Sequence, residues 1–195
     1  MYNNQYPYFP YYINLPTYPV FNELWRSETP KFASFSGIVR RIDAFYPAPN
    51  DPSADCYFLM SLESKEYGPL NFVISPETYF VDHEVVEVGD EVTGFYDATK
   101  PAILIYPPQF PAVVVSKNKS HQNVTVNYFN NDLISSNGML KLNISPSTEV
   151  FLTNDQPFER PLENRNLVVI YGPTTKSIPA QTTPYRIIVL CQTCI

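Results

Sequence analysis

This sequence of 195 residues has few charged residues, few glycines and few cysteines, and each shortage excludes a class of protein. Charged residues make up only 16%, and the net charge of −6 argues against the phosphate neutralisation that non-specific nucleic-acid binding requires. Six glycines exclude a collagen and are too few for a phosphate-cradling loop. No apolar run approaches the roughly 18 residues of a membrane span, so no membrane partner is expected.

The N-terminus also lacks the basic start and uninterrupted apolar stretch of a secretory signal. No charge precedes Glu23, and amide, aromatic and proline residues alternate through residues 1–10. Export through a signal peptide is therefore not expected. Deposition on a spore surface or release by cell lysis needs no signal, and a cytoplasmic location is the alternative.

Aromatic residues and prolines are what the sequence has in quantity. Residues 1–30 hold six Tyr and five Pro, and each proline pushes the residue before it toward extended geometry. These residues are therefore expected to form an extended arm, which either contacts another subunit or folds back on its own domain. Its aromatic side chains suit interface anchors, having large flat surfaces and polar tips. The expected anchors are Tyr2, Tyr6, Tyr8, Phe9, Tyr11, Tyr12 and Tyr18.

From residue 32 onward the pattern becomes that of β-structure. Short runs rich in β-branched and aromatic residues, such as 35–42, 56–62 and 70–74, recur about every ten residues between Pro, Asn and Asp. Residues 84–88 lead into a further expected strand at 91–96. No stretch shows a sustained helical period. The pattern predicts an all-β fold of small antiparallel barrels or sandwiches.

The second half of the chain repeats the first. Residues 70–78 match 140–148, 92–100 match 167–176 with one insertion, and 111–115 match 184–189, in the same order. We therefore expect an arm at 1–30 followed by two tandem β-domains, 31–118 and 119–195, with the boundary in a polar stretch. The Gly-Asp-Glu-Val-Thr-Gly run at 89–94 is typical of later strands in barrels of the OB type, although small sandwiches read almost the same.

Alternation also predicts the residues of the core and one turn. The expected core residues are Ile38, Ile42, Phe58, Phe72, Ile74, Val92 and Val114 in the first domain, and Leu142, Ile144, Val168, Ile170, Ile187 and Val189 in the second. Asn137-Gly138, between two apolar runs, predicts a type I′ hairpin.

Short sequence segments in each half of the chain resemble those of a known family. The sequence reads FYDA at 95–98 and IYPPQ at 105–109, and YGPTTKSIPAQTTP at 171–184. With these phrases, residues 35–190 resemble a family of tandem OB-like β proteins of spore-forming anaerobic bacteria. That resemblance implies tandem OB-like domains and brings no catalytic residues. The composition of the arm resembles the N-termini of spore-coat proteins and of subunits that build spore appendages.

Cys191 and Cys194, the CxxC at the C-terminus, are the most distinctive chemical feature. A redox role needs the motif at a helix N-terminus, whereas here it follows an expected strand. Zinc needs four ligands, and the chain offers besides these only Cys56, His83 and His121, in unrelated segments. Two free thiols and intermolecular disulfides through Cys56, Cys191 and Cys194 stay open as alternatives.

Catalysis is poorly supported by the sequence. The two histidines lie near no nucleophile motif, and Asp82 and Glu84 read as exposed acids of a turn as well as an acid–base pair. No catalytic residue, metal or cofactor is therefore expected. Lys and Arg are scattered, so aromatics such as Phe72 and Tyr96 are expected to face the core and not to stack on nucleic acid. Aromatic residues with Asn and Asp also suit a glycan.

The sequence therefore predicts a non-enzymatic structural subunit that self-assembles through its N-terminal arm into a homo-oligomer or polymer, in a spore surface layer or filament. The alternative is an OB-like binding module for a glycan or protein ligand.

Overall fold

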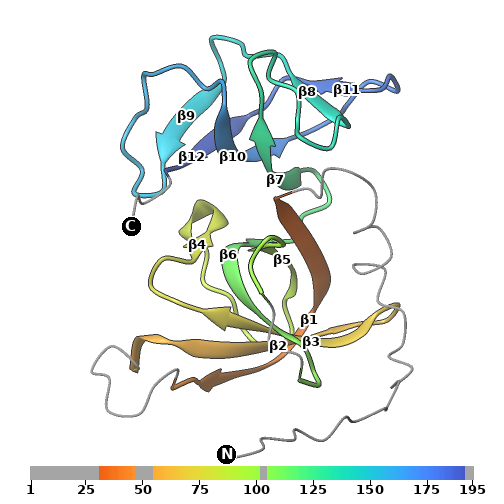
Figure 1. Ribbon diagram of the computed structural model, residues 1–195, viewed down its shortest axis with the longest axis vertical. Helices are drawn as coiled ribbons and strands as arrows, with labels where there is room; N and C mark the ends of the chain where they lie inside the picture. The colour runs from red at the N-terminus through yellow and green to blue at the C-terminus, as the bar shows by residue number, and fades with distance from the viewer. Residues whose placement is uncertain (1–30, 47–54, 102–104, 192–195) are drawn as a thin grey trace, which may run out of the picture.

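The computed structural model describes residues 31–46, 55–101 and 105–191, and it confirms the all-β fold (Figure 1). Strands make up 51% of the described residues and helix 3%. The expected arm and Cys194 lie outside the described residues. The description below divides the strands into a first unit, β1 to β6, and a second unit, β7 to β12.

The first unit is a closed barrel of five strands. Its elements are β1 (Phe32–Ala44), β2 (Phe58–Ser64), β3 (Gly68–Ile74), β4 (Tyr79–Phe80), η2 (Val81–His83), β5 (Glu91–Asp97) and β6 (Gln109–Lys117). The order β3-β2-β1-β5-β6 closes because β3 also pairs with β6, in parallel, while the other neighbours are antiparallel. A five-stranded Greek-key barrel of this kind is the arrangement of the OB fold, so the barrel alternative holds here.

The barrel core depends on large and small residues in contact. Phe72 is fully buried, and a Cβ on Gly94 would overlap its ring, so only glycine fits there. Tyr96 stacks on Phe110 with ring centroids 4.2 Å apart. Aromatic rings therefore fill part of the interior, beside aliphatic side chains such as Met60 and Leu62.

Part of the predicted core of β1 and β2 is wrong. Phe35 and Val39 face the interior, Ile38 is half-buried, and Ile42 is exposed beyond a register shift between Val39 and Arg41. Ile38 lies on the face opposite to Val39, because side chains alternate along a strand. The bulge places Ile42 in the same row as buried Met60, with which it pairs, but Ile42 is exposed because β5 pairs with β1 only as far as Ile38. Phe58 is exposed at the start of β2.

The second unit has the same order of strands in shorter form. Its strands are β7 (Asn123–Phe129), β8 (Leu140–Leu142), β9 (Glu149–Leu152), β10 (Arg165–Tyr171), β11 (Ala180–Thr182) and β12 (Arg186–Leu190). They form a sheet β7-β10-β12-β9 and a pair β11-β8. Isolated bridges from Ser135 to Phe129 and from Ile134 to Lys141 stand where the first unit has β2.

Strand pairing shows which residues of the two units are equivalent. Phe95 pairs with Val114 in the first unit as Ile170 pairs with Arg186 in the second. The turns before β4 and β9 also correspond, because the hydroxyl of Thr78 donates to the Ala112 carbonyl at 2.9 Å and that of Thr148 donates to the Pro184 carbonyl at 3.0 Å. The repeat seen in the sequence is thus a repeat of strand order and hydrogen bonding.

The buried apolar residues fall into three clusters. One fills the first unit around Phe72, and one fills the second unit around Phe129 and Leu167. The third lies between the units and includes Val168 and Ile170. Most predicted core residues are buried, but Val114, Val168 and Ile170 belong to this third cluster and not to the interior of one unit.

Two other local predictions are wrong. Ile144 is exposed because it lies beyond the end of β8. The strand expected at 91–96 is β5, and residues 84–88 lead into it without strand structure, with Val85 and Val88 exposed. In the 135–140 turn only Gly138 has a positive φ, at 70°, and its N–H donates to the Ser135 carbonyl, so this is not the type I′ turn, which requires positive φ at two residues.

Candidate functional site at the junction of the two units

The junction between the units has an apolar centre. Phe95 and Val114 of the first unit pack with Val126, Val168 and Ile188 of the second in one buried cluster. These residues lie on the outer faces of their sheets, since the neighbouring strand positions fill the separate interiors. The strands therefore bury both faces here, which explains the nearly continuous apolar run of β10.

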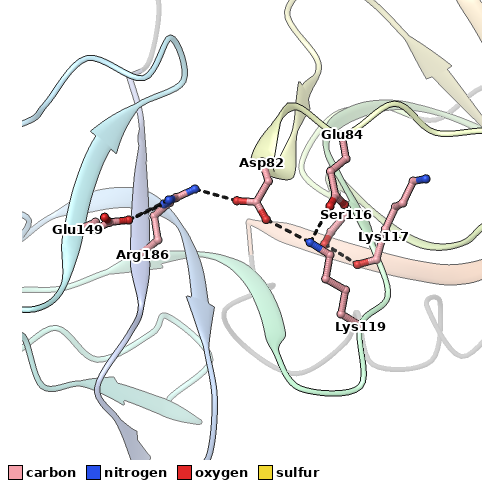
Figure 2. A network of polar contacts seen from close by, with 7 residues as sticks. All are labelled: Asp82, Glu84, Ser116, Lys117, Lys119, Glu149 and Arg186. Atoms are coloured by element: carbon pink, nitrogen blue, oxygen red, sulfur yellow. Dashed lines mark hydrogen bonds and ion pairs between the residues drawn. The ribbon is translucent and has the colours of Figure 1, made fainter.

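A network of polar contacts lies beside this apolar cluster (Figure 2). Asp82 of η2 accepts a hydrogen bond from Nη1 of Arg186 on β12 at 2.9 Å, and its other oxygen contacts Nζ of Lys119 at 3.3 Å. Arg186 also binds Glu149 on β9 at 2.8 Å, and Lys119 binds Glu84 at 2.8 Å. Asp82 thus joins β12 of the second unit to the connection between the units.

The backbone at Asp82 is what aims its carboxylate. Asp82 has φ of 57° and His83 has φ of 50°, a left-handed conformation that is uncommon outside glycine and costs about 1 kcal/mol or more per residue. His83 lies edge-on to the Tyr79 ring, with centroids 5.4 Å apart, and its Nε2 is 3.1 Å from a carboxylate oxygen of Asp155 on the second unit. The bend thus directs two side chains toward the other unit.

Each cation of the network has carboxylate partners. The hydrogen bond to Glu149 raises the pKa of Arg186, although partial burial opposes it, and the hydrogen bond to Glu84 raises the pKa of Lys119 in the same way. Burial raises the pKa of Tyr79 to about 12. These groups keep their ordinary charge states at neutral pH. The arrangement fastens the units together and presents no paired nucleophile and base.

A polar cavity of about 320 Å³ lies next to the network. Hydroxyl and amide side chains line it, together with Lys117, Lys119, Val124 and Tyr171. Lys117 is bound to Asp90 at 2.7 Å. Nε2 of Gln122 is buried and has no hydrogen-bond partner among the residues that the structure describes. The cavity can therefore offer one unpaired donor to a bound polar molecule.

Of the cysteines proposed from the sequence for cross-linking, the structure describes Cys56 and Cys191, and they form no disulfide with each other. Cys56 precedes β2 in the first unit and Cys191 follows β12 in the second, and both are exposed and free. Within residues 31–46, 55–101 and 105–191 there is no group of three or more His, Cys, Asp and Glu side chains that could hold a metal ion. The anchors of the arm lie outside these ranges.

The aromatic residues considered for stacking lie in the cores, as expected. Phe72 and Tyr96 are buried in the first unit, and Tyr79 and Phe95 lie in the junction. The outer face of the barrel instead carries a polar row, because Arg41 pairs with Ser61, Ser61 with Asn71, and Asn71 with Gln109.

Sequence reasoning missed the junction network. Asp82 and Glu84 read as exposed acids of a turn, whereas both bind Lys119. One signal was available, because Arg186 is the only charge in the apolar run 186–190 of a strand that is buried on both faces. A charge in such a position requires a partner.

Comparison with protein-family models and with curated proteins finds no match for this chain. Among the described residues there is no helix whose length and apolar character would let it cross a membrane.

Proposed function

We propose that this chain is a non-enzymatic structural subunit that self-assembles through its N-terminal arm, in a spore surface layer or filament. The observation that carries the proposal is the junction, where an apolar cluster and the Asp82–Arg186 ion pair join two units. These contacts hold the two units in a fixed orientation relative to each other. A subunit that repeats in an assembly needs such a fixed orientation, because each copy must present the same surfaces to its neighbours.

The sequence of the arm supports the same proposal. Twenty extended residues reach about 60–70 Å, which exceeds the width of a small barrel. Prolines restrict the free arm, so it loses less entropy on binding than a Gly/Ser segment does. Its tyrosines offer apolar rings with polar tips to the surface of another copy.

Exposed thiols supply a second kind of link. Cys56 and Cys191 lie on different units, so a disulfide between Cys191 of one copy and Cys56 of the next would extend a chain of subunits. Such bonds persist in oxidising surroundings outside the cell, which agrees with a spore surface.

The test compares the full chain with a variant lacking residues 1–20, by electron microscopy and size exclusion. We expect the full chain to form polymers and the deletion variant to be a folded monomer. A control with a Gly/Ser arm of equal length should also be monomeric. Non-reducing gels of the polymers should show ladders that Cys56→Ser removes.

Two results contradict the proposal of assembly. One is a deletion variant that forms the same polymer, and the other is a full chain that stays monomeric at high concentration. A single monomer band on the non-reducing gel contradicts covalent linkage alone.

A second candidate function is an OB-like binding module for a glycan or protein ligand. The polar row favours it, since it lies on the β2–β3 face that OB folds use for ligands. Arg41 is exposed and Ser61 and Gln109 are half-buried, whereas Asn71 in the same row is buried. A monodisperse monomer that a ligand stabilises against heat would support this candidate over assembly.

A further inference from the structure

The two units differ at one end of their interiors. Phe35 pairs with Gly94 in the first unit, and Thr125 pairs with Val169 in the second. Since Gly94 and Val169 are equivalent, Phe35 is equivalent to Thr125. Phe110, opposite Phe72, is equivalent to Thr182, opposite Leu142.

The third difference lies where the first unit has β2. Leu62 pairs with Val39 on β1, and Ser135 bridges Phe129 at the corresponding place on β7. Three large apolar side chains of the first unit are thus two threonines and a serine in the second.

These differences leave space in the second unit. In the first unit Phe110 stacks on Tyr96 in the core. The equivalent Tyr171 has Thr182 at the position of Phe110, and it lines a cavity of about 240 Å³. This volume is below the roughly 300–1,000 Å³ of pockets for drug-sized ligands. The cavity therefore fits a small ring.

Two asparagines of the cavity are held with their amide nitrogens available. Asn127 is 5% exposed, and its Oδ1 accepts hydrogen bonds from the Ser136 hydroxyl at 2.6 Å and the Tyr128 N–H at 3.1 Å. Oδ1 of Asn137 accepts from the Ser135 hydroxyl at 2.7 Å and the Met139 N–H at 3.1 Å. Among the described residues neither Nδ2 donates a hydrogen bond, so both can donate to a ligand oxygen.

The remaining lining decides the charge and shape of the ligand. Of the described residues that line the cavity, none is Lys, Arg, Asp or Glu. Thr125 adds a hydroxyl, and Tyr171 and Met139 add apolar surface. Burial raises the pKa of Tyr171, so its hydroxyl stays protonated at neutral pH. Oriented amide donors, hydroxyls and an aromatic ring without charge suit a neutral ring with many hydroxyl groups.

We propose that this end of the second unit binds one neutral sugar residue of a glycan, held by the amides of Asn127 and Asn137 against the ring of Tyr171. The residues that line this cavity do not belong to the arm. The sugar site is therefore tested separately from the assembly proposed above.

The test is a titration of the full chain with glucose, galactose and N-acetylglucosamine, followed by ¹H–¹⁵N NMR of the side-chain amides. We expect saturable shifts of the Asn127 and Asn137 signals with at least one sugar. Thr125→Phe, which restores the first unit's residue, should abolish them. Thr153→Phe places the same ring at an exposed position outside the cavity and should leave binding unchanged.

A further variant covers the case in which Thr125→Phe does not fold. Asn137 lies in an exposed turn, and Asn137→Ala should weaken binding at least tenfold by removing one donor. The proposal is overturned if none of the three sugars gives saturable shifts, if Thr125→Phe or Asn137→Ala binds as the parent does, or if sodium glucuronate binds in preference to glucose.

Discussion

Tyr96 has a buried hydroxyl whose ionisation lowers the stability of the fold in alkaline solution. Its hydroxyl is buried without a hydrogen-bond partner among the described residues, and burial raises its pKa to about 12. Because this value lies above the unfolded value of about 10, the contribution to stability is complete below pH 10 and is lost as the pH rises to 12. Ionisation of Tyr96 thus opposes folding only in alkaline solution.

Tyr96→Phe should therefore leave the free energy of unfolding at pH 7 unchanged or slightly higher, because no hydrogen bond is lost. Between pH 10 and 12 the variant should lose on the order of 2 kcal/mol less than the parent. Urea unfolding at pH 7 and pH 11.5 measures both, with exposed Tyr185→Phe as the control. Equal alkaline losses in Tyr96→Phe and the parent would refute the assignment.

At the scale of residues, burial was predictable where strands are regular. Phe72, Val92 and Ile187 are fully buried as their alternation predicts. Ile42 is exposed although it pairs with buried Met60, because β5 pairs with β1 only as far as Ile38. The tertiary fold determines where β5 stops pairing with β1, and the alternation of residues 35–42 does not show it.

At the scale of elements, the turns before β4 and β9 depend on one threonine each. The Ser75 N–H donates to the Thr78 hydroxyl at 3.0 Å, and that hydroxyl donates to the buried Ala112 carbonyl. Thr78→Val keeps the shape of the side chain and leaves both groups unpaired. We expect a loss of about 1–3 kcal/mol in the free energy of unfolding, measured in urea.

Thr148→Val makes the equivalent change in the second unit and should have an effect of the same sign, since Thr148 binds the Pro184 carbonyl. Thr153→Val, at an exposed position, is the matched control. If Thr78→Val has the same free energy of unfolding as this control, the hydrogen bonds of the Thr78 hydroxyl do not stabilise the turn.

The repeat of elements was visible in the sequence because these Ser-Pro-x-Thr turns recur at the same place in both halves. The shortening of the second unit was not visible. Isolated bridges at Ile134 and Ser135 replace a seven-residue β2, and two bridged residues are too few to give a pattern.

At the scale of the whole molecule, the junction should make the two units unfold together. Val168 is fully buried in the cluster shared by both units. Val168→Ala removes two methyl groups there and should lower the free energy of unfolding by on the order of 2 kcal/mol. Calorimetry should show one transition at a lower temperature.

Amide hydrogen exchange distinguishes a variant that destabilises both units from one that destabilises the second unit alone. In Val168→Ala the amides of β3 in the first unit should lose protection along with those of β10. Leu142→Ala, in the separate core of the second unit, is the comparison. Loss of protection confined to the second unit in Val168→Ala would show that the units unfold independently.

The candidate site could not be predicted because it is made by distant residues. Asp82 and Arg186 are 104 positions apart and meet only when the units pack. The same holds for the cavity of the second unit, which is recognised only when Thr125 and Phe35 are placed at equivalent positions.

The junction also has a consequence for the symmetry of the chain. Phe95 and its equivalent Ile170 both lie in the junction cluster, and so does Val81, whose equivalent Phe151 packs against it. Two identical domains that met through this face would form a two-fold symmetric dimer, in which every contact occurs twice. Two units of one chain need not meet that requirement. The Asp82–Arg186 pair occurs once, and the positions related to it hold Leu152 and Val114, so the junction is asymmetric at this contact.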